Sequence, residues 1–392
     1  MRQLFHILST IPLLIFFSGY DAEVAAAAGT YYVGTCKPGK AEYTTITSAI
    51  SKLGTAIPTG STIDVCPGIY HEQVTITQPV TLQAVQIGDS SQVVIAGPAS
   101  APVSTVSTPD NLIALVTISN SAGPVTLKGL TIDGTGLVSS GGDIAGIFYD
   151  SSPGVINEVI VQNFSAPSQS GYNVSAISVR DDSSLSPAVT VENSSISFPN
   201  GASNTSYIGI DAGFGATSTA MALTLSNNVI SNATAIGISI TNGTATVTGN
   251  LIVGMPGSES EGIFLGTFGS VKVSNNSITN FSIGLSAAVT QSAPSTITGN
   301  FIAAYDEDLT LLLSSANVSV TGNEFVSLPN APNGQGAVRQ VGVDISCSQN
   351  PTMSGNKFIG NLIALDNVPA GESLQNSAGT YIGVPSVEAL CN

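Results

Sequence analysis

One short phrase recurs six times in the second half of the chain. From Leu225 it reads "LSNNVI", and it returns as "VTGNLI", "VSNNSI", "ITGNFI", "VTGNEF" and "MSGNKF". The shared asparagines are Asn228, Asn250, Asn276, Asn300, Asn323 and Asn356, separated by 22, 26, 24, 23 and 33 residues. A repeat of this length is one small unit of structure that has to stack on its neighbours to bury its apolar side.

A second marker, a small residue followed by an aliphatic one, extends the repeat toward the N-terminus. It occurs at Gly146, Ala176, Gly209, Gly237, Gly262, Gly284, Gly342 and Ala364, with a weaker instance at Thr310. Between the markers lie alternating runs such as "ATVTG" and "VKVSN", which indicate half-buried strands. The repeats therefore predict an all-β right-handed parallel β-helix over residues 63–370, with coils about 4.8 Å apart.

The recurrent asparagine has an expected structural role. A sharp bend between two strands needs a residue near the left-handed α conformation, and asparagine tolerates that conformation better than any residue except glycine. A glycine or a second asparagine precedes it each time, which suits the same turn. Stacked on its counterpart in the next coil, the side-chain amide can also bond to main-chain groups, so we interpret the six asparagines as a structural ladder.

The two ends of the chain differ from the repeat. An apolar run of about a dozen residues followed by "VAAAAG" indicates a secretory signal peptide over residues 1–28. Residues 29–62 then contain "TTITSAISKLG", which predicts an amphipathic helix that caps the first coil. Its expected buried side is formed by Ile46, Ala49, Ile50 and Leu53. We expect residues 371–392 to shield the other end.

The charge and the cysteine content limit which binding partners and which cellular compartment the protein can have. The chain carries 9 basic and 25 acidic residues, and removal of Arg2, Asp21 and Glu23 with the signal peptide leaves 8 and 23, a net charge of −15. Such a chain is a poor ligand for nucleic acid or anionic membranes. Cys36 and Cys66 lie near the start and Cys347 and Cys391 near the end, so we expect one disulfide within each pair. We expect a monomer that is secreted, periplasmic or on the cell surface, without membrane insertion.

One N-terminal segment resembles a known superfamily. "YTTITSAI" followed by "STIDVCPGIYHEQVTITQPVTLQAV" is similar to the opening of pectinesterases and of the wider pectin-lyase-like superfamily, which carry a V-x-P-G-x-Y-x-E-x-V segment after a short helix. The later coils resemble carbohydrate-binding and sugar-hydrolase repeats. The resemblance covers nearly all of the chain after the signal peptide, and it implies a β-helix that contacts polysaccharide.

The motifs of the superfamily's enzymes are not found in the sequence. It contains no D-F-I-F-G, Q-D-T-L or G-R-P-W segment of the pectinesterase type. A polygalacturonase-like G-H-G element is excluded because His71 is the only histidine after the signal peptide. The sequence thus predicts carbohydrate contact without the known pectinesterase or polygalacturonase chemistry.

One outer face offers a candidate site. In each strand that starts at a small residue, the next side chain points inward and the following one outward. This pattern places outward Phe148, Asp150, Ser178, Arg180, Asp211, Ser239, Phe264, Ser286, Asp344 and Asp366. On three neighbouring coils, Asp150, Arg180 and Asp211 would lie within about 5–10 Å of one another, where they could act as catalytic residues of a lyase, hydrolase or epimerase. Substrate would be held by Phe148, Phe264 and the adjacent Asp181 and Asp182.

The alternative for this face is a salt-bridge ladder that keeps stacked strands in register and contributes little stability. The protein would then be a non-catalytic, adhesin-like solenoid. No cofactor is expected, although the "YDEDLT" segment from Tyr305 to Asp308 could bind Ca²⁺ if it is not simply a solvated turn.

Overall fold

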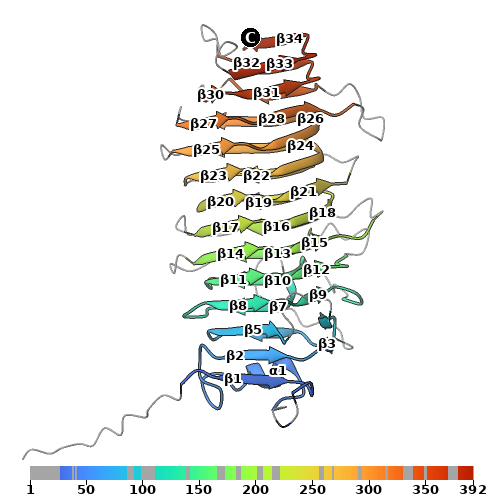
Figure 1. The fold of residues 1–392 in the computed structure, drawn as a ribbon, viewed down its shortest axis with the longest axis vertical. Coiled ribbons are helices and arrows are strands. Elements are labelled where there is room, and N and C mark those ends of the chain that lie inside the picture. Colours follow the sequence, from blue (N-terminus) through green and yellow to red (C-terminus); the bar gives the residue numbers. More distant parts are fainter. Residues whose placement is uncertain are drawn as a thin grey trace, which may run out of the picture.

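Parallel strands stack along the entire long axis of the molecule, from the N-terminal coil to the C-terminal one (Figure 1). The structure is a computed structural model. It describes residues 27–37, 39, 42–85, 92–98, 111–137, 142–165, 173–181, 187–200, 206–213, 221–255, 260–266, 269–289, 294–313, 317–329, 339–347, 351–369 and 378–391. Each pairing between the named strands is parallel, and the strands form three faces of a solenoid.

The first face is a separate sheet whose register does not shift between coils. It consists of β1 (Thr30–Val33), β2 (Thr62–Val65), β5 (Val80–Ala84), β8 (Val125–Lys128), β11 (Gly154–Asn157), β14 (Ala188–Glu192), β17 (Ala222–Ser226), β20 (Thr244–Thr248), β23 (Val271–Ser274), β25 (Ser295–Thr298), β27 (Val318–Thr321) and β30 (Thr352–Ser354).

The second face follows the turn at the end of each first-face strand. It consists of β3 (Gly68–His71), β6 (Val93–Ala96), β9 (Thr131–Asp133), β12 (Ile160–Gln162), β15 (Ser195–Ser197), β18 (Val229–Ala233), β21 (Leu251–Gly254), the first part of β24 (Ser277–Val289) and of β26 (Phe301–Leu313), β28 (Glu324–Ser327), β31 (Asn356–Ile359) and β33 (Gly379–Ile382).

The third face completes each coil. It consists of β4 (Val74–Ile76), β7 (Ile113–Ser119), β10 (Ile144–Asp150), β13 (Asn173–Arg180), β16 (Ser206–Ala212), β19 (Ile236–Ile240), β22 (Glu261–Leu265), the second part of β24 and β26, β29 (Val341–Asp344), β32 (Ile363–Val368) and β34 (Ser386–Leu390). Register shifts occur in three pairings, β18–β21, β24–β26 and β32–β34. All of these strands belong to the second or the third face.

Stacked aliphatic side chains fill the interior. The inward position of the third face is occupied by Ile147, Ile177, Ile210, Ile238, Ile263, Leu285, Leu309, Val343 and Leu365, and each is fully buried. Where glycine precedes one of these positions, it is required sterically. A Cβ on Gly237 would lie 2.4 Å from Cγ2 of Ile252 and 2.5 Å from the carbonyl oxygen of Gly262.

In one coil the second marker was predicted at the wrong position. Leu309, rather than Leu311, pairs with Leu285, so Asp308 instead of Thr310 occupies the place of the small residue. Asp308 is buried there because its carboxylate accepts hydrogen bonds from Nδ2 of Asn361 at 2.8 Å and from the backbone N–H of Ala304 at 2.9 Å. The same coil corrects a second prediction, since the Tyr305–Asp308 segment lies within β26 and is not a turn.

The asparagine ladder is present, and all six side chains are at most 2% exposed. Oδ1 of Asn228, in the first rung, accepts a hydrogen bond from the backbone N–H of Ser194. The other five rungs share one arrangement. Oδ1 of Asn276 accepts hydrogen bonds from the backbone N–H and from Nδ2 of Asn250, both at 2.9 Å, and Nδ2 of Asn276 donates to the carbonyl of Val247 at 3.0 Å. The amide thereby satisfies backbone groups that the turn removes from the strand ladder, which would otherwise be buried without partners.

The prediction that the ladder asparagines themselves adopt the left-handed conformation is wrong. The residue before each of them has positive φ: Asn227 (55°), Gly249 (67°), Asn275 (56°), Gly299 (65°), Gly322 (64°) and Gly355 (65°). The turn therefore divides two tasks between neighbours. The first residue supplies the backbone bend, and the second points inward and forms the hydrogen bonds.

A short helix and two disulfides lie at the ends of the stack. Helix α1 (Ile46–Ile50) buries Ile46, Ala49 and Ile50, as predicted. Its N-terminal N–H groups are bonded by Thr45 and by the carboxylate of Glu72, which accepts from Ile46 at 2.9 Å and from Thr47 at 2.8 Å.

Both predicted disulfides, Cys36–Cys66 and Cys347–Cys391, are formed. The ranges expected to act as caps also contribute strands, because β1 pairs with β2, and β33 and β34 pair with β31 and β32. Among the residues the structure describes, no helix is long and apolar enough to cross a bilayer.

Candidate functional site

The predicted outer row of the third face exists. Phe148, Ser178, Asp211, Ser239 and Phe264 are in register on β10, β13, β16, β19 and β22. The same row continues through Ser286, Thr310, Asp344 and Asp366. Because each residue lies one strand spacing from the next, the row brings together side chains that are 22 to 34 residues apart in sequence.

Asp150 and Arg180 belong to a second row, two residues further along the strands. They are in register with each other, whereas Asp211 pairs with Ser178. The three residues predicted as a group therefore lie diagonally across two rows, with Arg180 on the strand between the strands of Asp150 and Asp211.

A cavity of about 260 Å³ opens over this region. It is lined by Leu112, Asp143, Asn173, Ser175, Ser178, Arg180, Ile208, Asp211, Ile236, Ser239, Thr241 and Phe264. The lining thus combines a cation, two carboxylates, several hydroxyls and an amide with aliphatic and aromatic surface. A concave site with a few converging polar groups is the usual form of a small-ligand site.

Arg180 is nearly fully buried, with 5% of its surface exposed. Its guanidinium carbon lies 5.8 Å from the centre of the Phe148 ring, a cation–π geometry. Phe148 itself is fully buried, so the prediction that its ring offers a platform to a sugar is corrected. The ring packs against the guanidinium of Arg180, which lines the cavity.

Asp211 has a perturbed acidity. Burial raises the pKa of its carboxyl from the ordinary 3.8 to about 6, a rise that a hydrogen bond with Ser239 and the charge of Arg180 reduce and the charge of Asp143 increases. A carboxyl with a pKa near 6 exchanges its proton close to neutral pH, which is the property of a general acid or base.

The other predicted site residues are placed as follows. Phe264 is half-buried and lines the cavity, whereas Asp150 is not in the lining and its carboxylate accepts a hydrogen bond from Oγ of Ser151 at 3.0 Å. Asp181 is fully buried and therefore does not present a surface to a ligand, which corrects its predicted role. Asp182 lies outside the described residues.

Sequence reasoning missed Asp143, Asn173 and Thr241, which line the cavity at the ends of their strands. Asp143 immediately precedes β10, and its Oδ1 accepts a hydrogen bond from the backbone N–H of Asn173 at 2.9 Å. The outward pattern begins after each small residue, so it does not reach Asp143 and Asn173 at the strand starts. Thr241, two residues after Ser239, follows the pattern and could have been found from it.

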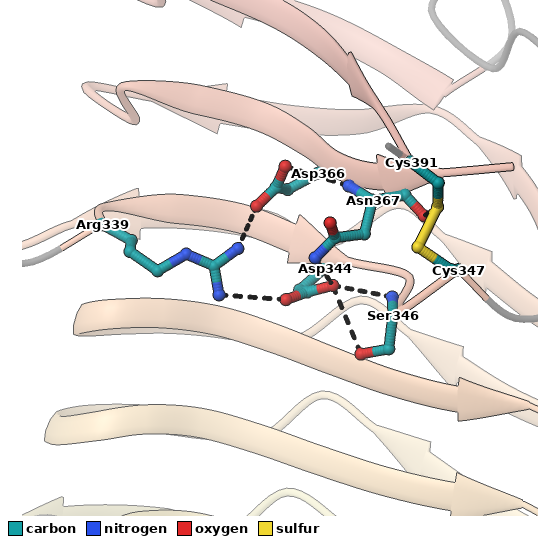
Figure 2. The surroundings of a disulfide bond; sticks show 7 residues. All are labelled: Arg339, Asp344, Ser346, Cys347, Asp366, Asn367 and Cys391. Atoms are coloured by element: carbon teal, nitrogen blue, oxygen red, sulfur yellow. Dashed lines mark hydrogen bonds and ion pairs between the residues drawn. A yellow bond between two sulfur atoms is a disulfide. The ribbon is translucent and has the colours of Figure 1, made fainter. Parts of the chain in front are cut away.

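A second charged cluster lies near the C-terminal disulfide (Figure 2). Arg339 bridges carboxylates from three successive coils, with Nη1 2.5 Å from Glu307 Oε1 and 3.2 Å from Asp344 Oδ2, and with Nη2 bonded to Asp366. One arginine thus pairs with all three carboxylates and offsets part of their negative charge. Within the described part of the chain, no three His, Cys, Asp or Glu residues are arranged to hold a metal ion.

Comparison with known proteins identifies the fold. Residues 212–380 match the family model described as a right-handed β-helix region. The fold is a right-handed parallel β-helix. No curated protein sequence matches this β-helix.

Three solved structures are similar to the β-helix. The Dettilon tailspike protein (gp208) is 14% identical with a TM-score of 0.52, over 90% of this chain and 68% of its own. The GH136 lacto-N-biosidase from Eubacterium ramulus is 10% identical with a TM-score of 0.55, over 93% and 68%. The pectin methylesterase from Aspergillus niger is 16% identical with a TM-score of 0.41, over 83% and 90%. At these identities the likeness concerns the fold alone.

Proposed function

We propose that the protein is secreted and binds an extracellular carbohydrate in the cavity around Arg180 and Asp211. The observation that carries the proposal is the lining itself, in which a buried guanidinium, a carboxyl and the hydroxyls of Ser178, Ser239 and Thr241 converge. These groups donate and accept in the alternation that sugar hydroxyls require. The half-buried ring of Phe264 adds the apolar surface against which a sugar face can pack.

Secretion is supported by the two disulfides, which persist in oxidising compartments, and by the apolar N-terminal run. Solved structures with the same fold include a tailspike and a lacto-N-biosidase. Fold similarity of this kind supports the class of ligand and leaves the chemistry to the residues of the cavity.

A second candidate function is acid–base catalysis on the bound saccharide. The specific observation in its favour is the pKa of about 6 for Asp211, within hydrogen-bonding reach of Ser239 and close to Arg180. A lyase, hydrolase or epimerase would use this carboxyl to transfer a proton to or from the sugar, with Arg180 stabilising negative charge.

The binding proposal is tested with a matched pair of serines. Ser239→Ala removes a lining hydroxyl that bonds Asp211, and Ser286→Ala removes a half-buried hydroxyl of the same row outside the cavity lining. On a glycan array, Ser239→Ala and Arg180→Met should weaken binding at least tenfold, and Ser286→Ala should not change it. Equal affinity in all three variants and the wild type would refute the site.

The catalytic alternative is tested on a panel of polysaccharides, with and without Ca²⁺, by measuring unsaturated products and reducing ends. Asp211→Asn should abolish any turnover while leaving binding detectable. Retained binding by the wild type without product on any polysaccharide would reject the catalytic alternative and leave the binding proposal standing.

A further inference from the structure

The first face carries an ordered array of hydroxyl groups on its C-terminal half. In β17, β20, β23, β25, β27 and β30, two outward positions separated by one inward residue are occupied almost entirely by threonine or serine. The first row consists of Thr224, Thr246, Lys272, Thr296, Ser319 and Thr352. The second row consists of Ser226, Thr248, Ser274, Thr298, Thr321 and Ser354.

The array is regular in two dimensions. Neighbouring coils are one strand spacing apart, about 4.8 Å, and the two rows are two residues apart along the strand, about 6.6 Å. No register shift interrupts these six strands, whereas the other two faces contain several. Five steps of about 4.8 Å give the array a length of about 24 Å.

The side chains of the array are held in place. Oγ of Ser274 donates to Oγ1 of Thr248 at 3.0 Å, and Oγ1 of Thr321 donates to Oγ1 of Thr298 at 3.1 Å. Threonines of the first row are β-branched, which restricts rotation about χ1 in a strand. Hydroxyls of the first row bond to no residue that the structure describes, so they are available to water or to a ligand.

The character of the array excludes several partners. It is a flat row of strands instead of a cavity, which does not suit a small molecule. It lacks the Tyr, Trp, Phe, Met and Arg that dominate protein interfaces. Its only charge is Lys272, although the whole chain has a net charge of −16. A charge-poor surface complements an uncharged partner, and no aromatic ring in either row can stack on a sugar.

We propose that this array, on the first face from β17 to β30, binds the surface of ice. Ice is an uncharged solid whose oxygen atoms repeat in two directions, and each can accept and donate hydrogen bonds. A threonine hydroxyl donates one hydrogen bond and accepts two, and its methyl group orders the adjacent water. A rigid array of such side chains holds a layer of water in a fixed arrangement that can join the crystal, with little entropy lost on contact.

Lys272 is the one position that departs from the pattern, and it provides a gain-of-function test. Lys272→Thr completes the first row, while Thr246→Tyr places a bulky ring in its centre. Thr380→Tyr is the matched control, since Thr380 is an exposed threonine of β33 on the second face. All three proteins should unfold at the temperature of the wild type. Lys272 and Thr380 are exposed and Thr246 is partly exposed, and all three occupy strand positions, which tolerate β-branched and aromatic residues.

The experiment measures thermal hysteresis and the shape of growing ice crystals, with the full secreted chain and both disulfides intact. We expect faceted crystals with the wild type, a several-fold loss of hysteresis in Thr246→Tyr, an increase in Lys272→Thr, and no change in Thr380→Tyr. Unfaceted growth with the wild type and with Lys272→Thr would refute the proposal. Binding to crystalline cellulose or chitin that Thr246→Tyr abolishes, without any effect on ice, would also refute it and assign the array to a crystalline polysaccharide.

Discussion

Adjacent residues of the asparagine turn should differ sharply in their contribution to stability. In Asn276→Ala, Nδ2 of Asn250 keeps the carbonyls of Leu225 and Thr248 as acceptors, but the backbone N–H of Asn250 loses its acceptor and the carbonyl of Val247 loses a donor. These two backbone groups are buried between coils. At about 1–3 kcal/mol for each buried polar group left without a partner, the loss is about 4 kcal/mol.

The neighbouring substitution Asn275→Gly is the control. Asn275 has φ of 56°, a conformation that glycine adopts without steric cost, and its side chain is exposed. The expected change is within about 1 kcal/mol. The two variants thus separate the hydrogen bonds of the ladder from the bend of the backbone.

The assay is equilibrium unfolding in guanidinium chloride, followed by far-ultraviolet circular dichroism because the chain has no tryptophan. Both disulfides are kept oxidised, so that the unfolded reference is the same in all variants. A loss below about 1 kcal/mol in Asn276→Ala, or an equal loss in the two variants, would contradict the hydrogen-bond accounting.

Two further predictions concern buried charge. The pKa of Asp211 is raised from 3.8 to about 6, so the wild type should lose up to about 3 kcal/mol of stability as the pH rises between these two values. Asp211→Asn should lack this loss. A series of unfolding curves at different pH values measures both. In Arg339→Met, the buried carboxylates of Glu307, Asp344 and Asp366 lose their shared cation, which lowers stability by about 2 kcal/mol at pH 7. The loss should be smaller at pH 4, because burial raises the pKa of Glu307 and its protonation removes one of the repelling charges. An equal effect at both pH values would show that the ion pairs contribute nothing.

The sequence predicted the architecture because its two markers have direct physical causes. Small residues such as Gly237 occur where a Cβ would collide with the next coil, and ladder asparagines occur where buried backbone groups need partners. Both requirements repeat with every coil, so they appear in the sequence as a period. The bend was assigned to the wrong residue because two adjacent polar residues share one turn, and only φ values distinguish them.

The candidate site was predicted less completely. Periodicity correctly placed Asp211, Ser239 and Phe264 on one row, because side chains alternate strictly along a strand. It could not place Asp143 or Asn173, which reach the cavity from the ends of strands. Nor could it show that Phe148 is buried, since burial of an outward residue depends on what lies over the face.

The positions of the two disulfides determine where unfolding of the molecule can begin. Each coil of a solenoid contacts only its neighbours, so a terminal coil has half the contacts of an interior one and would ordinarily fray first. Cys36–Cys66 and Cys347–Cys391 join residues 30 and 44 positions apart at the two extremities, and these links remain closed when hydrogen bonds open. Unfolding of the oxidised protein must therefore begin between the crosslinks, whereas the coils of the reduced protein can unfold one after another from either end.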